Sequence, residues 1–299
     1  MKIFKIINCP ICDFKEFIIL IKGKHSNYSI NKIKSFFSSS SNIFIDQIVK
    51  CLNCNFIYTN PRINKNIIIR GYKNTKDKTF ISQNKERYVT FLNSIKKINN
   101  IINIKEDHHL LDVGTADGTF LEVCAKLKLN IEGIEPSKWL VAKGKKREIK
   151  IFQGVFEQYK FKKKYDVIFF WDVLEHTFDL KKTKNKISSL IKKNGHLIVN
   201  VPDHDSFARK YLKLNWPFYL NVHLYYFNQE SLKNLFKNEF NYIYKFPHFQ
   251  ILKLEYIFRR AIVYYPLLKY ILKIIFLLKI NNMRIKYNMG QTTYIFKKK

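Results

Sequence analysis

Short apolar runs alternate with segments of helical periodicity along much of the chain. The runs from Leu110 to Val113 and from Tyr165 to Trp171 are apolar at most positions, as expected of strands that are covered on both faces. Between Phe80 and Ile104, apolar residues recur at helical spacing, which predicts a helix packed against the sheet. This alternation is typical of an α/β fold with a mostly parallel sheet.

The same periodicities set the expected boundaries of the other elements. Strands are expected at 130–135, 149–154, 196–202, 242–246 and 292–296, and helices at 137–147, 181–193 and 229–238. In this interpretation Gly195 ends the helix that precedes the fifth strand.

A turn-rich segment follows the first apolar run. Gly114-Thr115-Ala116-Asp117-Gly118 precedes a helical pattern that starts near Thr119, and Glu135 ends the next strand 21 positions after Gly114. Glycines let a backbone approach a ligand closely, and a helix N-terminus offers unpaired N–H groups. A carboxylate can accept both hydrogen bonds of a ribose diol. The spacing therefore predicts a nucleoside-binding unit.

Several motifs in order carry a family resemblance. LDVGTADG at 111–118, GIEPS at 133–137 and YDVIFFWDVLEH at 165–176 resemble the class I S-adenosylmethionine-dependent methyltransferases. The likeness continues with HLIVNVPD after Gly195 and with HLYYFNQESLKNLF at 223–236, so it covers most of the chain. It implies a doubly wound, Rossmann-like sheet of seven mostly parallel strands, of which the last is antiparallel. One departure is Ala116, which stands where the family often has glycine; its methyl group is unstrained unless φ is positive.

The resemblance also implies S-adenosylmethionine as the cofactor and suggests which residues hold it. They lie in the glycine loop and at neighbouring strand ends: Asp112, Gly114, Thr115, Gly118, Glu135, Phe156, Trp171 and Asp172. Phe156 falls where the family contacts adenine, and it is either a stacking partner or a plain core residue. The fourth strand brings Trp171, Asp172, Glu175 and His176 to the carboxyl-terminal edge, where open α/β sheets bind ligands.

Two histidines are candidates for the general base that removes the acceptor's proton, because an unperturbed imidazole has a pKa near working pH. His223 is the first candidate, since it lies in the long aromatic segment 203–227 that we interpret as a lid over the acceptor. His176 is the second. Alternatives remain open: His223 caps local backbone groups, His176 makes a structural hydrogen bond, or Asp172, Glu175 and His176 ligate a divalent ion.

Two CxxC pairs stand near the N-terminus, Cys9 with Cys12 and Cys51 with Cys54, separated by 38 residues. Each pair places two sulfurs on one tight turn, and two such turns complete a tetrahedral S₄ site that suits Zn²⁺. We interpret residues 1–62 as a structural zinc-ribbon-like module with an exposed insertion at 35–42. Four unrelated cysteines and a redox pair are the alternatives; Cys124 is expected to be a small core residue.

The remaining chain divides into a linker and helix at 63–104 and a methyltransferase domain at 105–299. That domain carries a hydrophobic, basic insertion at 251–286. Within it, 266–280 combines apolar residues with Lys269 and Lys273 at helical spacing, which predicts a helix lying on a membrane surface. A helix packed on the domain or on a dimer partner is the alternative.

The charge balance alone does not identify a partner. Lys+Arg 54 against Asp+Glu 23 gives a formal net charge of +31, which favours anionic partners. Lysine is nevertheless scattered together with Asn, Ile, Tyr and Phe, as an A/T-biased coding sequence would produce. The tip WDVLEH also lacks the [DN]PP[YF] motif used on exocyclic base nitrogens, so nucleic acid is disfavoured. The start MKIFKIINCPIC has no signal-peptide core, and we expect a cytoplasmic protein, peripheral to the inner face of the membrane if 266–280 binds there.

The features together predict an enzyme that moves a methyl group from S-adenosylmethionine to a small-molecule, sugar or lipid-linked acceptor. The transfer is an in-line displacement at a sulfonium, so the protein must align the two reactants. An RNA or DNA methyltransferase and a non-catalytic scaffold with the same fold are the alternatives. Intact Asp112, Gly114, Gly118 and Glu135 argue against the scaffold.

Overall fold

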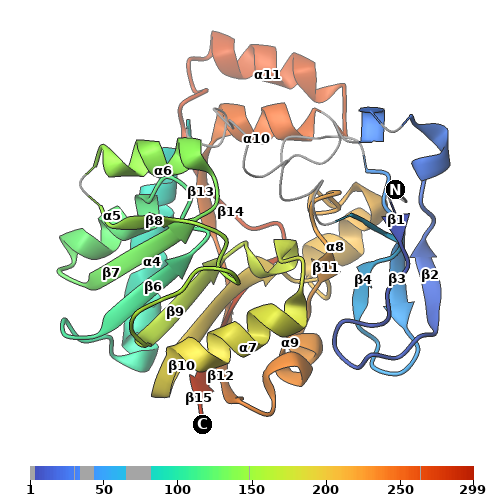
Figure 1. Cartoon of the computed structure of the whole chain (residues 1–299). Coiled ribbons are helices and arrows are strands. Elements are labelled where there is room, and N and C mark those ends of the chain that lie inside the picture. The colour runs from blue at the N-terminus through green and yellow to red at the C-terminus, as the bar shows by residue number, and fades with distance from the viewer. Residues whose placement is uncertain (1–3, 30, 34–43, 65–81, 148, 263) are drawn as a thin grey trace.

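A seven-stranded sheet with helices on both faces forms the centre of the computed structural model (Figure 1). The structure describes residues 4–29, 31–33, 44–64, 82–147, 149–262 and 264–299. The insertion expected at 35–42 and most of the linker expected from residue 63 lie outside these ranges.

The strand order of the central sheet is that of the predicted doubly wound fold. In spatial order the strands are β12 (Phe240–Pro247), β15 (Gln291–Lys298), β10 (Ile191–Pro202), β9 (Tyr165–Trp171), β6 (His109–Val113), β7 (Asn130–Glu135) and β8 (Ile151–Gln153). β10, β9, β6, β7 and β8 are parallel, whereas β15 is antiparallel to β10 and β12. The expected reversal of the last strand is confirmed.

Both faces of the sheet are buried, which explains why its central strands are apolar at successive positions. Leu110 and Phe169 face α4 (Asn84–Ile102) and α5 (Thr119–Lys126), with α6 (Lys138–Lys145) beside them. The alternate residues Leu111 and Phe170 face the other side, which is covered by α7 (Leu180–Leu190) and α9 (Gln229–Phe236). The period of two in side-chain direction thus divides each strand between two cores.

One predicted boundary is wrong. The helix expected at 181–193 ends at Leu190, and Gly195 lies inside β10, whose register against β9 shifts between Ile191 and His196. A Cβ on Gly195 would lie 2.7 Å from the carbonyl oxygen of Asp166. The glycine is therefore required by an irregularity in a strand and does not cap the helix.

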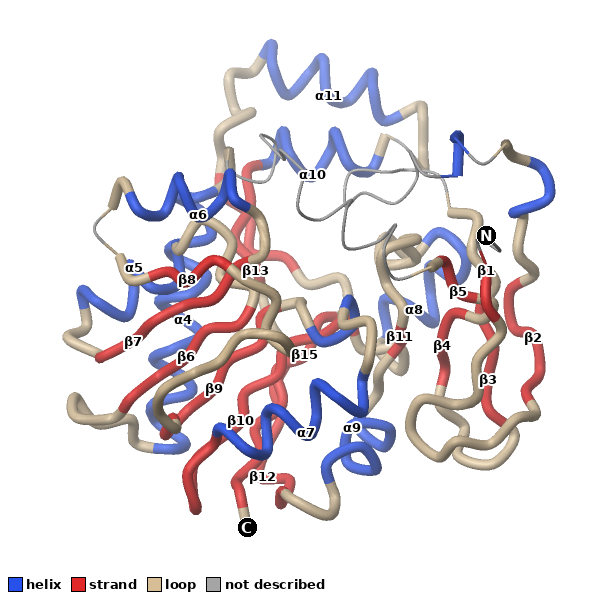
Figure 2. Tube along the Cα trace, in the orientation of Figure 1, coloured by secondary structure: helices blue, strands red, loops and turns tan. Residues whose placement is uncertain are grey.

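A small N-terminal module packs against the side of the sheet that carries α7 and α9 (Figure 2). It contains β1 (Phe4–Lys5), β2 (Phe17–Ile21), the 3₁₀ turn η1 (His25–Asn27), β3 (Ile48–Cys51), β4 (Ile57–Thr59) and β5 (Arg62–Ile63). β1 pairs with β5, and β2, β3 and β4 form an antiparallel sheet. The fourth strand of that sheet is β11 (Tyr225–Tyr226), which comes from the predicted lid. The module and the lid therefore share one sheet.

The predicted lid at 203–227 is well packed and contains regular structure. It includes α8 (Phe207–Leu212), the 3₁₀ turn η3 (Lys213–Asn215) and β11. Trp216 is fully buried, and its Nε1 donates a hydrogen bond of 2.7 Å to the carbonyl oxygen of Met289. This contact ties the lid to the turn before β15.

The insertion at 251–286 is a helical hairpin on a two-stranded base. β13 (Gln250–Lys253) pairs with β14 (Arg284–Tyr287), and between them α10 (Leu254–Ala261) packs against α11 (Leu268–Leu277). Figure 1 shows the hairpin projecting from the body of the molecule. Among the residues placed by the structure, no helix has both the length and the apolar character needed to cross a bilayer.

Candidate functional site

The glycine loop after β6 adopts the left-handed backbone that close approach to a ligand requires. Gly114 and Gly118 have φ values of +70° and +82°, and Ala116 has φ +53°. Ala116 thus occupies the one conformation in which its methyl group is strained. Its N–H donates a hydrogen bond of 3.0 Å to Oε2 of Glu135, which helps to hold this backbone.

Glu135 ends β7 beside this loop, as the sequence predicted. Its Oε1 accepts a second backbone hydrogen bond of 2.8 Å from the N–H of Ser137, so both oxygens are positioned before any ligand binds. Burial raises the pKa of Glu135 to about 7 and that of Asp112, on β6, to about 7. Removal of water makes the charged carboxylates costly, so a hydrogen-bond donor or a cation is the ligand that suits them.

Buried polar atoms without partners mark the same edge. They include Oδ1 of Asp112, Oγ1 of Thr115 and Nε1 of Trp171. Buried polar groups are normally hydrogen-bonded, so orphans gathered at the carboxyl ends of adjacent strands fit a polar ligand such as S-adenosylmethionine. The residues present therefore suit the cofactor that the resemblance implies.

Asp172 and Phe156 already have specific contacts within the protein. Asp172 has φ +54°, and its two carboxylate oxygens accept hydrogen bonds from Asn200 and Gln291 at 2.8 and 2.6 Å. Burial raises the pKa of Asp172 to about 6. The ring of Phe156 packs against Phe161 and Phe170 in the core.

Arg87, on the first turn of α4, is a further candidate for the site, which sequence reasoning missed. Burial lowers the pKa of its guanidinium to about 10, and the nearby carboxylates of Asp117, Asp172 and Asp112 favour its charged form. It brings a positive charge to an edge that is otherwise acidic. The available signal was an arginine next to Tyr88 on a helix already expected to pack against the sheet.

The two predicted catalytic histidines lie together. The ring centroids of His176 and His223 are 4.6 Å apart, and Glu175 lies beside them, so that one ligand atom of each falls within 4.8 Å of the others. His176 and Glu175 belong to the 3₁₀ turn η2 (Leu174–His176), just after β9, whereas His223 precedes β11. Tertiary structure joins residues 47 positions apart.

Both histidines also contact backbone carbonyl oxygens, which was the structural alternative to a catalytic role that the sequence allowed. Nδ1 of His176 lies 3.0 Å from the carbonyl oxygen of Val222, and Nδ1 of His223 lies 2.8 Å from that of Phe218. Burial lowers the pKa of His176 to about 4 and the pKa of His223 well below its usual value; the neighbouring His176 lowers the latter further. The imidazoles are therefore neutral at pH 7, and neither keeps the unperturbed pKa expected of it.

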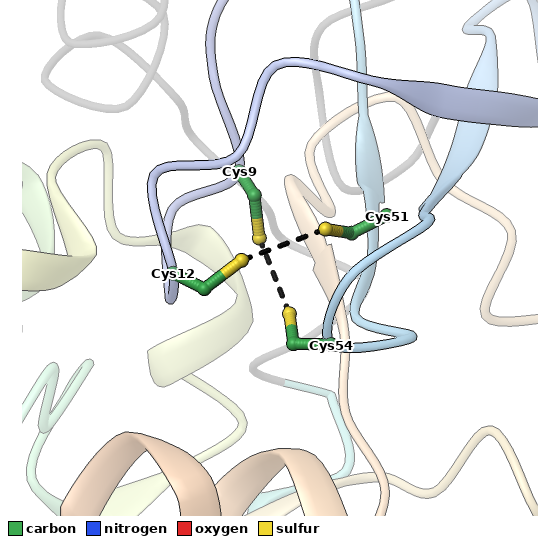
Figure 3. Close-up of side chains that lie close together, drawn as sticks. All are labelled: Cys9, Cys12, Cys51 and Cys54. Atoms are coloured by element: carbon green, nitrogen blue, oxygen red, sulfur yellow. Dashed lines mark hydrogen bonds between the residues drawn. The ribbon is translucent and has the colours of Figure 1, made fainter.

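The four cysteines of the two CxxC pairs converge on one point (Figure 3). The sulfurs of Cys9 and Cys54 are 3.5 Å apart, and those of Cys12 and Cys51 are 3.6 Å apart. Tetrahedral bonds of about 2.3 Å place sulfurs roughly 3.8 Å apart, so the cluster has the size of a Zn²⁺ site. All four ligand positions would be filled by protein, which is typical of a structural metal.

Comparisons with known proteins agree with this geometry. Residues 80–242, more than half of the chain, match the family model described as a methyltransferase domain. The ubiquinone biosynthesis O-methyltransferase of Pelagibacter ubique (strain HTCC1062) is 38% identical over 96 residues, which is 30% of this chain and 40% of the relative. This match spans less than half of that relative's length.

A solved structure of low identity shares the fold. A Bacillus halodurans C-125 structure described as a methyltransferase superposes with a TM-score of 0.50 at 13% identity, covering 69% of this chain and 98% of its own. A methyltransferase of Archaeoglobus fulgidus, described as S-adenosylmethionine-dependent, gives a TM-score of 0.49 at 18% identity, covering 75% of this chain and 100% of its own.

We predict one tightly held Zn²⁺ per chain at Cys9, Cys12, Cys51 and Cys54. Replacing Cys51 with serine removes a ligand from a closed site, so zinc content should fall below about half an equivalent and the N-terminal module should lose stability. Elemental analysis and thermal unfolding measure the two effects. Cys124→Ser, which changes a buried cysteine in α5, is the control and should keep its zinc. Wild-type protein that is purified without chelator and contains no zinc would contradict the prediction.

We predict that Glu135→Gln weakens binding of S-adenosylmethionine by about 1.5–3 kcal/mol, because the charged acceptor for the ribose is lost while the side-chain size is kept. Titration calorimetry measures the affinity. Glu230→Gln, an exposed carboxylate on α9, is the control and should bind as the wild type does. Equal affinities of the Glu135 variant and the wild type would remove Glu135 from the ribose site.

Proposed function

We propose, from the premise that this chain belongs to the class I S-adenosylmethionine-dependent methyltransferases, that it methylates a small-molecule, sugar or lipid-linked acceptor. The observation that carries the proposal is the meeting of two features at one edge of the sheet. The glycine loop with Glu135 offers a nucleoside site, and the lid brings His223 to η2 beside it. A methyl donor and its acceptor would then meet in a place shielded from water.

The proposed cofactor contacts follow from the chemistry of each part of the molecule. Glu135 accepts hydrogen bonds from the ribose. The N–H groups of Gly114, Thr115 and Gly118 already donate to backbone carbonyl oxygens within the protein, so the contribution of this loop is the close approach that its glycines allow. Phe156 contacts the adenine from the end of β8. Asp112, Trp171 and Asp172 surround the methionine end, and Arg87 supplies the positive charge that the methionine carboxylate needs.

We assign the catalytic role to His223 first and to His176 second. Each presents a neutral imidazole, whose lone pair can take the proton of an acceptor hydroxyl or hold an electrophile that makes this proton more acidic. The rest of the rate enhancement comes from alignment of the acceptor with the sulfonium. A lone pair of the acceptor forms the new bond to the methyl carbon, and the electron pair of the broken C–S bond stays on sulfur, which turns the sulfonium into a neutral thioether.

An oxygen atom of a non-nucleic-acid acceptor is the favoured target. The curated relative is named for O-methylation in ubiquinone biosynthesis, and the tip of β9 lacks the motif that base-nitrogen methyltransferases use. The test supplies the protein with labelled S-adenosylmethionine and, separately, with lipid extract, nucleotide-linked sugars, polar metabolites and RNA. Label transferred to RNA alone would favour the nucleic-acid alternative; label transferred to none, with the cofactor bound, would favour a scaffold.

The hairpin of α10 and α11 is the proposed membrane contact. α11 buries Leu272 and Ile275 against the protein, while other apolar side chains are exposed; they include Leu267, Ile271, Ile274, Leu277, Leu278 and Ile280. Residues 256–283 contain five Lys or Arg and no Asp or Glu. Glu255, the acidic residue of α10, is paired with Arg259 at 2.7 Å. An apolar surface with an excess of positive charge suits an anionic membrane, and it would bring the enzyme close to a lipid-linked acceptor.

We predict that His223→Ala lowers kcat by roughly 10²–10⁴ with little change in cofactor affinity, because the change removes a group that acts on the acceptor's proton. The assay uses the acceptor identified by label transfer. His196→Ala changes a half-buried histidine of low pKa in the middle of β10 and should keep normal turnover. Normal turnover of His223→Ala together with its loss in His176→Ala would move the role to His176.

We predict that the protein sediments with anionic vesicles and less with neutral ones. Replacing Lys269 and Lys273 with glutamate should weaken binding by about 1 kcal/mol or more for each lysine removed. Replacing Ile274 and Leu277 with glutamate should abolish it, because both side chains are exposed apolar groups of α11. Ile19→Glu, at an exposed position of β2, is the control. Equal sedimentation with both vesicles, or with neither, would contradict the membrane contact.

A further inference from the structure

Glu175 is a buried carboxylate that nothing in the described structure satisfies. It is 1% exposed, and neither of its oxygens has a hydrogen-bond partner from another residue. Burial raises its pKa well above the usual value, and the nearby Asp172 raises it further. An unpaired buried carboxyl group is destabilising, so its retention beside two histidines indicates a missing partner.

The hydrogen bonds of the two histidines determine which ring nitrogen carries the lone pair. A backbone carbonyl oxygen can only accept a hydrogen bond, so the contacts to Val222 and Phe218 place the proton of each ring on Nδ1. In a neutral imidazole the lone pair is then on Nε2. Histidines that ligate metals typically donate their other ring N–H to a carbonyl or carboxylate in this way, which fixes the tautomer and the orientation of the ring.

Asp172 does not complete this cluster, although the sequence offered it as a ligand with Glu175 and His176. Its two oxygens already accept hydrogen bonds from Asn200 and Gln291. The acidic and imidazole groups whose ligand atoms come within 4.8 Å of one another are instead Glu175, His176 and His223. The lid histidine takes the place that the sequence pattern gave to the strand-end aspartate.

We infer that Glu175, His176 and His223 form a binding site for a first-row divalent cation, separate from the four-cysteine site. Two imidazoles and a carboxylate are the donor set of many such sites and leave positions open for a substrate oxygen. Bonds of about 2.1 Å allow ligand atoms at most roughly 4.2 Å apart, and the three ligand atoms, all within 4.8 Å of one another, have a spacing of this size.

This inference deepens the proposed function, on which its catalytic meaning rests. A cation held at the acceptor edge lowers the pKa of an acceptor hydroxyl that binds to it. The hydroxyl proton passes to water, the oxygen forms the new bond to the methyl carbon, and the C–S electron pair returns to sulfur. His223 and His176 act as ligands in this mechanism, which agrees with their low pKa values.

The test measures binding of Co²⁺ to full-length protein whose cysteine site has first been filled with zinc. Elemental analysis counts both metals, and visible absorption distinguishes cobalt bound by nitrogen and oxygen from cobalt bound by thiolates. The wild type should take up about one Co²⁺ while it keeps its zinc. Glu175→Gln, which keeps the size of the side chain, and His223→Ala should each weaken cobalt binding by at least about tenfold. Asp172→Asn should bind Co²⁺ as the wild type does.

The outcomes separate this site from the wider proposal, because cobalt binding needs no acceptor and no turnover. No uptake of Co²⁺ beyond replacement of zinc, or equal binding by the wild type, Glu175→Gln and His223→Ala, would overturn the site. Loss of binding in Asp172→Asn with retention in His223→Ala would shift the ligand set to Asp172, Glu175 and His176. Methyl transfer that persists after complete removal of the second metal would overturn its catalytic role and leave the methyltransferase intact. Circular dichroism of each variant confirms that lost binding does not reflect unfolding.

Discussion

The pairing of β4 with β11 is the interaction on which the acceptor half of the site depends. The N–H of Thr59 donates to the carbonyl oxygen of Leu224 at 3.0 Å, and its Oγ1 donates to the carbonyl oxygen of His223 at 3.1 Å. The N–H of Leu224 in turn donates to the carbonyl oxygen of Glu175 at 2.8 Å. One strand of the N-terminal module thus holds the backbone of both segments that meet at the histidines. The cysteine cluster lies at the turn before β4, so a metal bound there would hold this strand and, through it, the proposed catalytic residues far away in sequence.

Burial favours the neutral form of the acidic and imidazole side chains along the ligand edge. It raises the pKa values of Asp112 and Glu135 and lowers those of His176 and His223, because charged forms are costly where water is excluded. Such an edge favours partners that bring charge or donors of their own. A sulfonium cofactor, with its ribose hydroxyls, is a partner of this kind for the carboxylates, and a divalent cation is one for Glu175 and the neutral imidazoles.

The hairpin of α10 and α11 follows a different logic from the rest of the molecule. Its base, β13 paired with β14, is held to α4, where the N–H of Ile251 donates to Oγ1 of Thr90 at 2.8 Å. Its helices instead expose large apolar side chains, among them Leu277, which is 80% exposed. A paired base that carries apolar, basic helices is suited to present the enzyme to a surface, and α4 also carries Arg87 at the cofactor edge. The proposed membrane contact and cofactor site therefore share one supporting helix.

The sequence by itself determined the parts of this protein that depend on local pattern. The strands 130–135 and 165–171 were predicted residue for residue. The second is a nearly continuous apolar run, as a strand covered on both faces requires, whereas the first, NIEGIE, is marked by its place after the first helix and by its acidic end. The glycine loop and CxxC pairs have spacings with few other meanings. The helix before Gly195 was predicted too long, since a glycine in a strand irregularity looks like a glycine after a helix. Only the tertiary structure decided that β11 joins the N-terminal sheet, that Asp172 is saturated by Asn200 and Gln291, and that His223 replaces it beside Glu175. These contacts join residues far apart in the chain, and no local periodicity records them, because they arise from how the strands and the lid pack in space.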